Sequence, residues 1–195
     1  MNSLKDIWSQ FQKFIRLNQD VFIRFSNDRY ESGNSLIVVL VSLLSIYIPF
    51  ILNASSTNIS DIVFYGLVDG VFAWLFATLA SWFLLTRAFN TIIEITNLLI
   101  FTGYTHGILG IFGIIIFVNN YISIPQNIFQ LLTLFIFGWM YFVLTKALAT
   151  AFLLDKRTSS IASVTFLAIL IFFSDPIRIF AVSYTHLTLP TRLLV

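Results

Sequence analysis

The chain has 195 residues, of which 58% are hydrophobic, 17% aromatic and 10% charged, and its mean hydropathy is +0.90. A water-soluble fold of this size could not cover so much apolar surface, so the composition indicates an integral membrane protein. The net charge of +2 is too small to indicate a nucleic-acid partner, and the absence of cysteine excludes disulfides and thiolate metal sites.

Residues 1–34 form a polar segment that carries an apolar stripe at helical spacing. This pattern predicts a cytoplasmic amphipathic segment of two helices, with a break around residues 18–20. The stripe lies either in the membrane interface, where basic side chains reach lipid phosphates, or against the bundle itself. The apolar positions are Leu4, Ile7, Trp8, Phe11, Phe14, Ile15, Val21, Phe22 and Phe25, and the basic positions between and after them are Lys5, Lys13, Arg16, Arg24 and Arg29.

Residues 35–181 contain five apolar stretches that approach the length of a membrane span, which is about 20 residues. The predicted spans cover residues 36–52, 62–86, 98–118, 128–154 and 158–180. The fifth is the least regular, because only residues 161–173 are continuously apolar and Asp175, Pro176 and Arg178 fall near its end. The pattern predicts an all-α polytopic membrane helix bundle of about five transmembrane helices.

Lysine and arginine are distributed unevenly between the predicted loops. The segment before the first span is basic, Arg87 follows the second span, and Lys156 and Arg157 follow the fourth, whereas residues 53–61 and 119–126 contain no lysine or arginine. The positive-inside rule then places the N-terminus in the cytoplasm. We expect a multi-pass protein of the cell membrane.

Residues 182–195, VSYTHLTLPTRLLV, do not continue the preceding pattern. In one reading frame, residues 182–191 match the translation of a transposase-type sequencing adapter, and the adapter bases that follow account for Val195 and a stop codon. We therefore expect residues 182–195 to be a translated adapter in a metagenomic fragment whose natural C-terminus is missing. The alternative is a genuine polar tail.

Two ionisable side chains, Asp69 and His106, fall inside predicted spans, where burial of such groups is costly and often functional. At 1.5 Å per residue their depths differ by roughly 8 Å, so a direct pair requires helix tilt or a bridging water. They either line a proton or ion path or are satisfied separately. In the second case, His106 bonds a hydroxyl such as Thr102 or Thr105, and Asp69 reaches interfacial water or Arg178.

Small residues indicate how the spans pack. They are Gly103, Gly107 and Gly110 in the third span and Ala73, Ala77 and Ser81 in the second. Glycines four residues apart allow two helices to approach closely, so the second and third spans are predicted to pack on each other. Self-association through the glycine face is the competing interpretation.

The motifs of soluble enzymes are missing, including a phosphate-binding glycine loop, a His-Glu-x-x-His zinc signature and a Gly-x-Ser-x-Gly elbow. His106 is the one histidine outside the expected adapter segment, and no carboxylates are near it in sequence. We expect no enzymatic activity, no cofactor and no metal site.

The order of motifs resembles the YIP domain family, whose members are five-span membrane proteins named for interaction with Ypt/Rab-type GTPases. The similarity is strongest where FNTIIEI (residues 89–95) is followed by GYTH (residues 103–106), and it continues through FGW (residues 137–139) and KA (residues 146–147). It extends over roughly residues 20–180, and the short N-terminal region is similar to the minimal prokaryotic type.

The resemblance implies a non-enzymatic membrane-organisation or trafficking scaffold that acts in the lipid bilayer through protein partners or as a homo-oligomer. The alternative is a small transporter or channel subunit built around Asp69 and His106.

Overall fold

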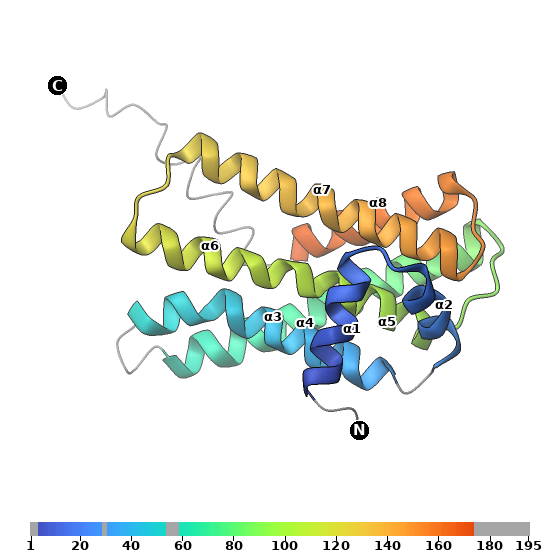
Figure 1. Cartoon of the computed structure of the whole chain (residues 1–195), viewed down its shortest axis with the longest axis horizontal. Coiled ribbons are helices and arrows are strands. Elements are labelled where there is room, and N and C mark those ends of the chain that lie inside the picture. The colour runs from blue at the N-terminus through green and yellow to red at the C-terminus, as the bar shows by residue number, and fades with distance from the viewer. Residues whose placement is uncertain (1–3, 29–30, 54–58, 174–195) are drawn as a thin grey trace.

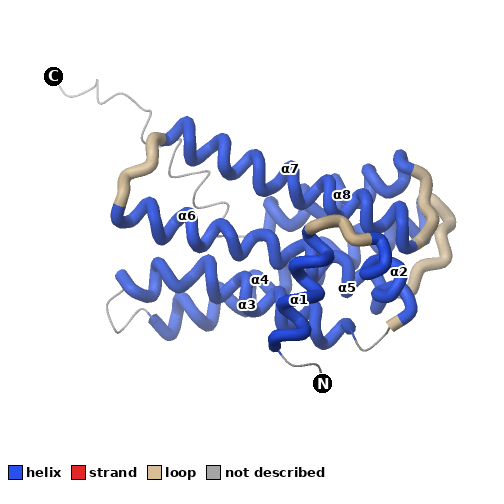
Figure 2. Tube along the Cα trace, viewed as in Figure 1, coloured by secondary structure: helices blue, strands red, loops and turns tan. Residues whose placement is uncertain are grey.

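The computed structural model describes residues 4–28, 31–53 and 59–173 of the chain (Figure 1). Over these residues the chain consists of helices and connecting loops, with no β-strand (Figure 2). Residues 174–180, which complete the predicted fifth span, and the expected adapter segment at residues 182–195 lie outside the described residues.

Five helical segments are long and apolar enough to cross a membrane: Glu31–Leu52, Gly66–Ala88, Ile95–Tyr121, Gln126–Ala151 and Lys156–Phe173. The prediction of an all-α polytopic membrane helix bundle with about five transmembrane helices is therefore confirmed. The helices, in chain order, are α1 (Leu4–Ile15), α2 (Gln19–Asn27), α3 (Glu31–Asn53), α4 (Ile59–Phe83) with the π-helical turn η1 (Leu84–Ala88), α5 (Ile95–His106), the 3₁₀ turn η2 (Gly107–Leu109), α6 (Gly110–Tyr121), α7 (Gln126–Ala151) and α8 (Lys156–Phe173).

The third span lies at the centre of the bundle and consists of α5, η2 and α6. Every residue from Phe101 to Leu109 is buried, and α5 contacts α3, α4 and α7. The helix tightens into a 3₁₀ turn at Gly107, whose N–H reaches the carbonyls of both Gly103 and Thr105. A 3₁₀ segment inside a helix is a common local adjustment, and glycine on both sides of it removes the Cβ atoms that would hinder close packing.

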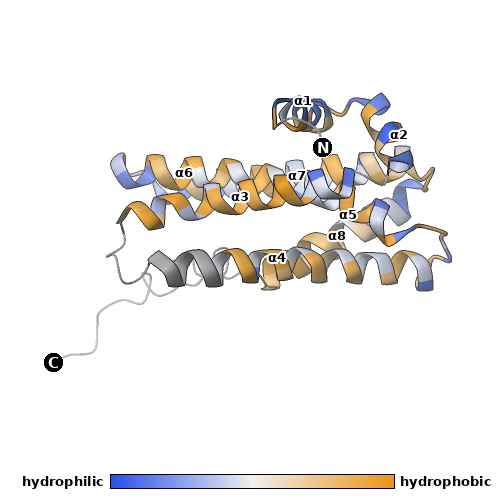
Figure 3. Ribbon diagram, turned by 90° about the horizontal axis from the view of Figure 1, so that it is seen from below, coloured by the Kyte–Doolittle hydropathy of each residue, from blue (hydrophilic) through white to orange (hydrophobic). Residues whose placement is uncertain are grey.

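The two N-terminal helices cover one side of the bundle. Figures 1 and 3 show that α1 runs across the bundle axis, on the side formed by α3, α6 and α7, whereas α4 lies on the far side. Asn18 begins α2 by accepting a hydrogen bond from the Asp20 backbone N–H at 2.9 Å. This Asn cap explains why the apolar stripe breaks between the two helices.

Most of the apolar stripe packs against the bundle, as the second of the two predicted alternatives states. Phe14 and Phe25 are fully buried, and both rings contact Tyr104 in α5, with centroid separations of 5.5 and 4.5 Å. Leu4 and Trp8 are the exception, because 72% and 57% of their surfaces are exposed. The stripe therefore divides into a face against the bundle and an exposed apolar edge.

Basic side chains gather at one end of the bundle, where α4 and α7 end and α5 and α8 begin. This basic end carries Arg87, Lys146, Lys156 and Arg157. Asp155 precedes α8 there, and its carboxylate accepts a hydrogen bond from the Thr158 backbone N–H at 3.0 Å. Hydrogen bonds from Thr158 hold the pKa of Asp155 below its usual value.

Large apolar side chains point outward along the spans, as the composition predicts for a surface that faces lipid. In Figure 3 the spans are coloured mostly as hydrophobic residues along their length. Exposed members include Phe72 and Phe76 on α4 and Leu131, Leu134 and Phe135 on α7.

Candidate functional site

The central helix α5 carries four buried polar side chains within five residues. They are Thr102, Tyr104, Thr105 and His106. Thr105 donates to the Phe101 carbonyl of its own helix at 2.8 Å, whereas the other three contact side chains of neighbouring helices. Polar contacts between helices are an established source of helix association in membranes, so these side chains define the candidate site.

Glu31, at the first position of α3, is 2% exposed. The Tyr104 hydroxyl donates to its Oε2 at 3.0 Å, and the Asn34 amide donates to the same oxygen at 2.9 Å. Hydrogen bonds to a charged group are stronger than those between neutral groups, and a buried carboxylate without them would be costly. The contact therefore joins α3 firmly to α5.

The N-terminal helices complete this cluster. With its amide nitrogen toward the carboxylate, Gln10 of α1 donates to both oxygens of Glu31, at 3.1 and 3.0 Å. Its amide oxygen then accepts from Arg24 of α2 at 3.3 Å. One buried carboxylate thus connects side chains of α1, α2, α3 and α5, which we term the Glu31 cluster.

His106 lies between α5 and α3 and is 1% exposed. Its Nδ1 atom is within hydrogen-bond distance of the Ser42 hydroxyl, at 2.7 Å, and that hydroxyl donates to the Val39 carbonyl at 2.9 Å. The predicted partners Thr102 and Thr105 were wrong, since their hydroxyls are directed to the backbone of α5 and toward α4. Ser42 could not be predicted as the partner because it is 64 residues away in sequence.

A third contact joins α5 to α4. The Trp74 indole donates to the Thr102 hydroxyl at 3.2 Å, and the Thr78 and Thr102 hydroxyls are 2.9 Å apart. The second and third spans therefore do contact each other, as predicted, but through these hydrogen-bonding side chains. Hydroxyls that also bond their own backbone remain satisfied inside the apolar bundle.

Asp69 lies apart from these contacts. It is exposed on α4, whereas His106 is enclosed between α3 and α5. No hydrogen bond or ion pair joins the two among the residues that the structure describes. The structure thus brings His106 to Ser42 and leaves Asp69 on the surface, and Arg178, the other predicted partner of Asp69, is outside the described residues.

The glycine face of the third span packs on α3, the first span. The prediction that this face packs on the second span was therefore wrong. A Cβ atom at Gly103 would meet the Ser35 side chain at 2.8 Å, and one at Gly110 would meet the Ser42 backbone at 3.3 Å. At Gly107 the neighbours are Val38 of α3 and Phe11 of α1. These contacts occupy the glycine face within one chain, which removes the basis for self-association through it.

The small stripe of the second span is buried, with Ala73, Ala77 and Ser81 each no more than 3% exposed. Ser81 donates to the Ala162 carbonyl of α8 at 3.3 Å, and α4 packs extensively on α8. The stripe therefore serves helix packing toward the fifth span at this position.

Within the described ranges, no three His, Asp or Glu side chains lie close enough together to hold a metal ion. Comparison with models of protein families, with curated proteins and with solved structures gives no match for this chain. The class of protein defined by the fold and the site is therefore a polytopic helical membrane protein whose interior polar groups bond across helices.

Sequence reasoning missed Glu31, Gln10, Ser42 and Gly113 as members of the interior. Gly113 continues the glycine face by one turn, and a Cβ atom there would overlap the Ser45 backbone carbonyl. Its spacing from Gly110 was a usable signal. The sequence signal at Glu31 was weaker, since an acidic residue directly before a span is ordinarily solvated at the helix N-terminus.

Proposed function

We propose that this chain is a non-enzymatic integral membrane protein of the YIP type, which organises membranes through protein partners. The assignment to this type rests on the sequence resemblance. The rest of the proposal, a non-enzymatic organising role, is supported by the pairing of interior polar groups with one another. His106 bonds Ser42, Thr102 bonds Thr78, and Tyr104 bonds Glu31, so these groups hold helices together.

A transport path would need ionisable or hydrated groups in series through the bundle. His106 is buried and is hydrogen-bonded to the Ser42 hydroxyl, and Asp69 is on the outer surface of α4. This separation favours the scaffold over the transporter that the sequence left open.

The N-terminal helices supply a surface for partners in this proposal. On α2, Ile23 is 52% exposed and lies in a shallow depression with Asp20, Arg24, Asn27 and Asp28. An exposed apolar side chain within a polar rim is a common arrangement in protein interfaces. The basic end then faces the cytoplasm of the cell, as the positive-inside rule requires.

The test measures proton flux in liposomes and partner binding in native membranes. In liposomes carrying an internal pH dye, the wild-type protein and Asp69→Asn should both give the proton leak of empty vesicles. A partner cross-linked in native membranes should be recovered with the wild type and lost with Ile23→Ser. Phe135→Ser, on the lipid-facing side of α7, is the matched control and should still recover the cross-linked partner. Proton flux that Asp69→Asn abolishes would contradict the proposal and establish transport.

A further inference from the structure

An apolar cleft opens between α1 and the pair formed by α3 and α6. Its volume is about 340 Å³, and its walls include Leu4 and Trp8 of α1, Val41 and Ser45 of α3, and Ile111 and Ile114 of α6. The cleft exists because small residues line its floor, among them Gly107 and Gly110, so the ridges of α3 and α6 are low there. Its volume is in the range of sites that hold one small organic ligand.

The cleft is elongated along the span. Its lining runs along α3 from Ile37 to Ser45 and along the third span from Gly107 to Ile114. At 1.5 Å per residue these stretches measure roughly 12 and 10 Å. One end of the cleft is therefore at α1, and the other end points away from α1 toward the opposite end of the bundle. An acyl chain in a bilayer has this direction, with its headgroup at the surface.

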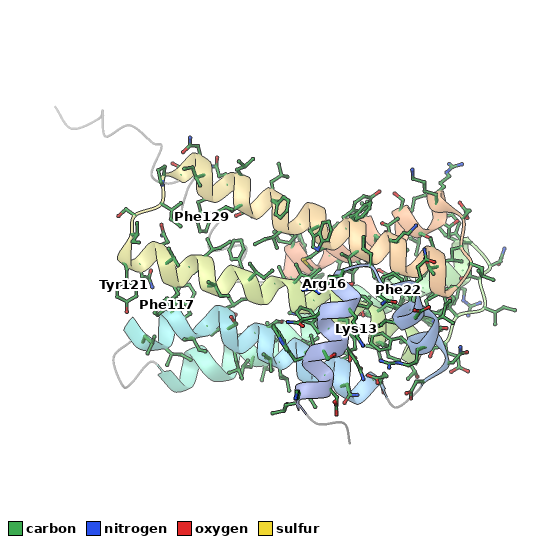
Figure 4. All side chains as sticks on the ribbon, in the orientation of Figure 1. Lys13, Arg16, Phe22, Phe117, Tyr121 and Phe129 are labelled. Atoms are coloured by element: carbon green, nitrogen blue, oxygen red, sulfur yellow. The ribbon has the colours of Figure 1, made fainter. Side chains whose placement is uncertain are left out.

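A basic side chain stands at the α1 end of the cleft. Lys5 is three residues before Trp8, so it lies beside Trp8, on the flank of the cleft wall that α1 forms. Lys5 is exposed and forms no ion pair with any residue in the described part of the chain. Lys13 also projects from α1 (Figure 4). Helical periodicity places it on the side of α1 away from Trp8.

We propose that this cleft binds one anionic phospholipid of the leaflet at the basic end. One acyl chain lies along α3 and α6 beneath Trp8, and the headgroup phosphate pairs with Lys5. The exposed apolar edge of α1 is then covered by lipid, while the opposite edge, with Gln10, holds the Glu31 cluster. This inference does not depend on the proposed scaffold function.

The charge of Lys5 and the direction of the cleft favour lipid over a second protein chain as the occupant. A protein segment would match both the cleft and the Lys5 ammonium only if it carried a carboxylate next to an apolar stretch at the membrane surface. A phospholipid supplies the phosphate and the apolar chain in one molecule, in the orientation that the bilayer imposes.

Quenching of Trp8 fluorescence tests the site directly. A variant that keeps Trp8 alone (Trp74→Phe, Trp82→Phe, Trp139→Phe) is reconstituted in phosphatidylcholine vesicles that contain either brominated-chain phosphatidylglycerol or brominated-chain phosphatidylcholine. The anionic lipid should quench Trp8 at a mole fraction about fivefold lower, the effect expected for one basic side chain near a membrane. Lys5→Gln should remove this preference, and Lys13→Gln, the matched control, should retain it.

Two further measurements keep the test independent of the tryptophan replacements, since Trp74 and Trp82 donate hydrogen bonds inside the bundle. In native mass spectrometry with added dioleoyl phosphatidylglycerol, the wild type and Lys13→Gln should retain one lipid per chain, and Lys5→Gln and the cleft-filling Val41→Phe should not. Val41→Cys, in a chain with no other cysteine, tests for a second copy by disulfide cross-linking.

Three results would overturn the proposal. The first is equal quenching by the two brominated lipids. The second is an equal loss of lipid in Lys5→Gln and Lys13→Gln, which would reduce the effect to general surface charge. The third is efficient cross-linking of Val41→Cys dimers without retained lipid, which would make a second copy the occupant.

Discussion

Glu31 is a carboxylate that begins a membrane-spanning helix and yet is 2% exposed. Its environment differs from the usual solvated position of an acidic residue at a helix N-terminus, because donors from α1, α3 and α5 converge on it. Hydrogen bonds from several donors together compensate the cost of burying a carboxylate. Removal of one donor leaves part of that cost uncompensated. The hydroxyl of Tyr104 is the donor contributed by the central span.

Tyr104→Phe should therefore lower the free energy of unfolding by about 1.5–3 kcal/mol, the range for a hydrogen bond to a charged group. The change removes one oxygen and keeps the ring that packs against Phe14 and Phe25. Unfolding in mixed detergent micelles, followed by circular dichroism, measures the loss.

Tyr121→Phe is the control for this substitution, since the same atom is removed from a side chain that is 74% exposed at the end of α6 (Figure 4). It should leave the unfolding free energy unchanged. Equal stability of Tyr104→Phe and Tyr121→Phe would show that the hydroxyl does not stabilise Glu31.

For individual side chains, the sequence identified polar residues inside spans but not their partners. His106 stands out because it interrupts an apolar run, and its burial follows from that position. Ser42 and Gln10 do not stand out, because serine is common in membrane spans and glutamine is common in amphipathic helices. Gln10 and Tyr104 are 94 residues apart, so only the tertiary packing determines that they meet.

Among the helices, the closest approach described by the glycines is between α3 and the third span. Gly103, Gly107, Gly110 and Gly113 each face α3, and Ser35, Ser42 and Ser45 on α3 are small as well. Ser45 donates to the Gly110 carbonyl at 2.8 Å, a contact that requires the two backbones to be near. Small residues on both helices thus allow packing and hydrogen bonding together.

Gly113→Ala should be strongly destabilising, by about 1–3 kcal/mol, because the added methyl group overlaps the backbone of α3 and the helices must separate. Gly138→Ala in α7 is the matched control, since a Cβ atom there meets nothing within 4 Å. The control should be neutral or stabilise the helix by about 0.5–1 kcal/mol. The same micelle unfolding assay compares them, and a Gly113→Ala protein as stable as Gly138→Ala would refute the close contact.

The existence and order of the helices could be predicted from hydropathy and helical periodicity, and so could the presence of a glycine contact face. The partner of that face could not. Both α3 and α4 offer small residues, and only the tertiary structure shows that Val38 and Phe11 lie beside Gly107. The sequence left lipid and bundle as alternative partners of the N-terminal stripe. In the structure Phe11 and Phe14 are buried against the bundle, and Leu4 and Trp8 are at the surface.

The whole molecule is asymmetric along its length. The basic end carries Arg87, Lys146, Lys156 and Arg157 and adjoins α2, whereas the loop at residues 122–125 at the opposite end has no charged residue. Such an asymmetry is the basis of the positive-inside rule. The orientation in the membrane can be measured with single-cysteine variants because the chain lacks cysteine.

Ser9→Cys on α1 and Ser123→Cys in the opposite loop provide two exposed single-cysteine reporters. In intact cells, a membrane-impermeant maleimide should label Ser123→Cys and not Ser9→Cys, because the positive-inside rule predicts that the basic end faces the cytoplasm. After the membrane is permeabilised both should react, which controls for accessibility. Labelling of Ser9→Cys in intact cells would reverse the orientation.

The position of α1 and α2 against the third span has a consequence for biosynthesis. Residues 4–27 are synthesised before residues 95–121, yet Phe14 and Phe25 bury their rings against Tyr104. At about 5–20 residues per second, the separation of 94 residues between Gln10 and Tyr104 corresponds to roughly 5–19 seconds of translation. During that interval the apolar stripe has no bundle to cover it, and the membrane surface is the partner at hand. We therefore expect the stripe to lie on the membrane surface first, and Phe14 and Phe25 to pack against the bundle once the third span has been synthesised.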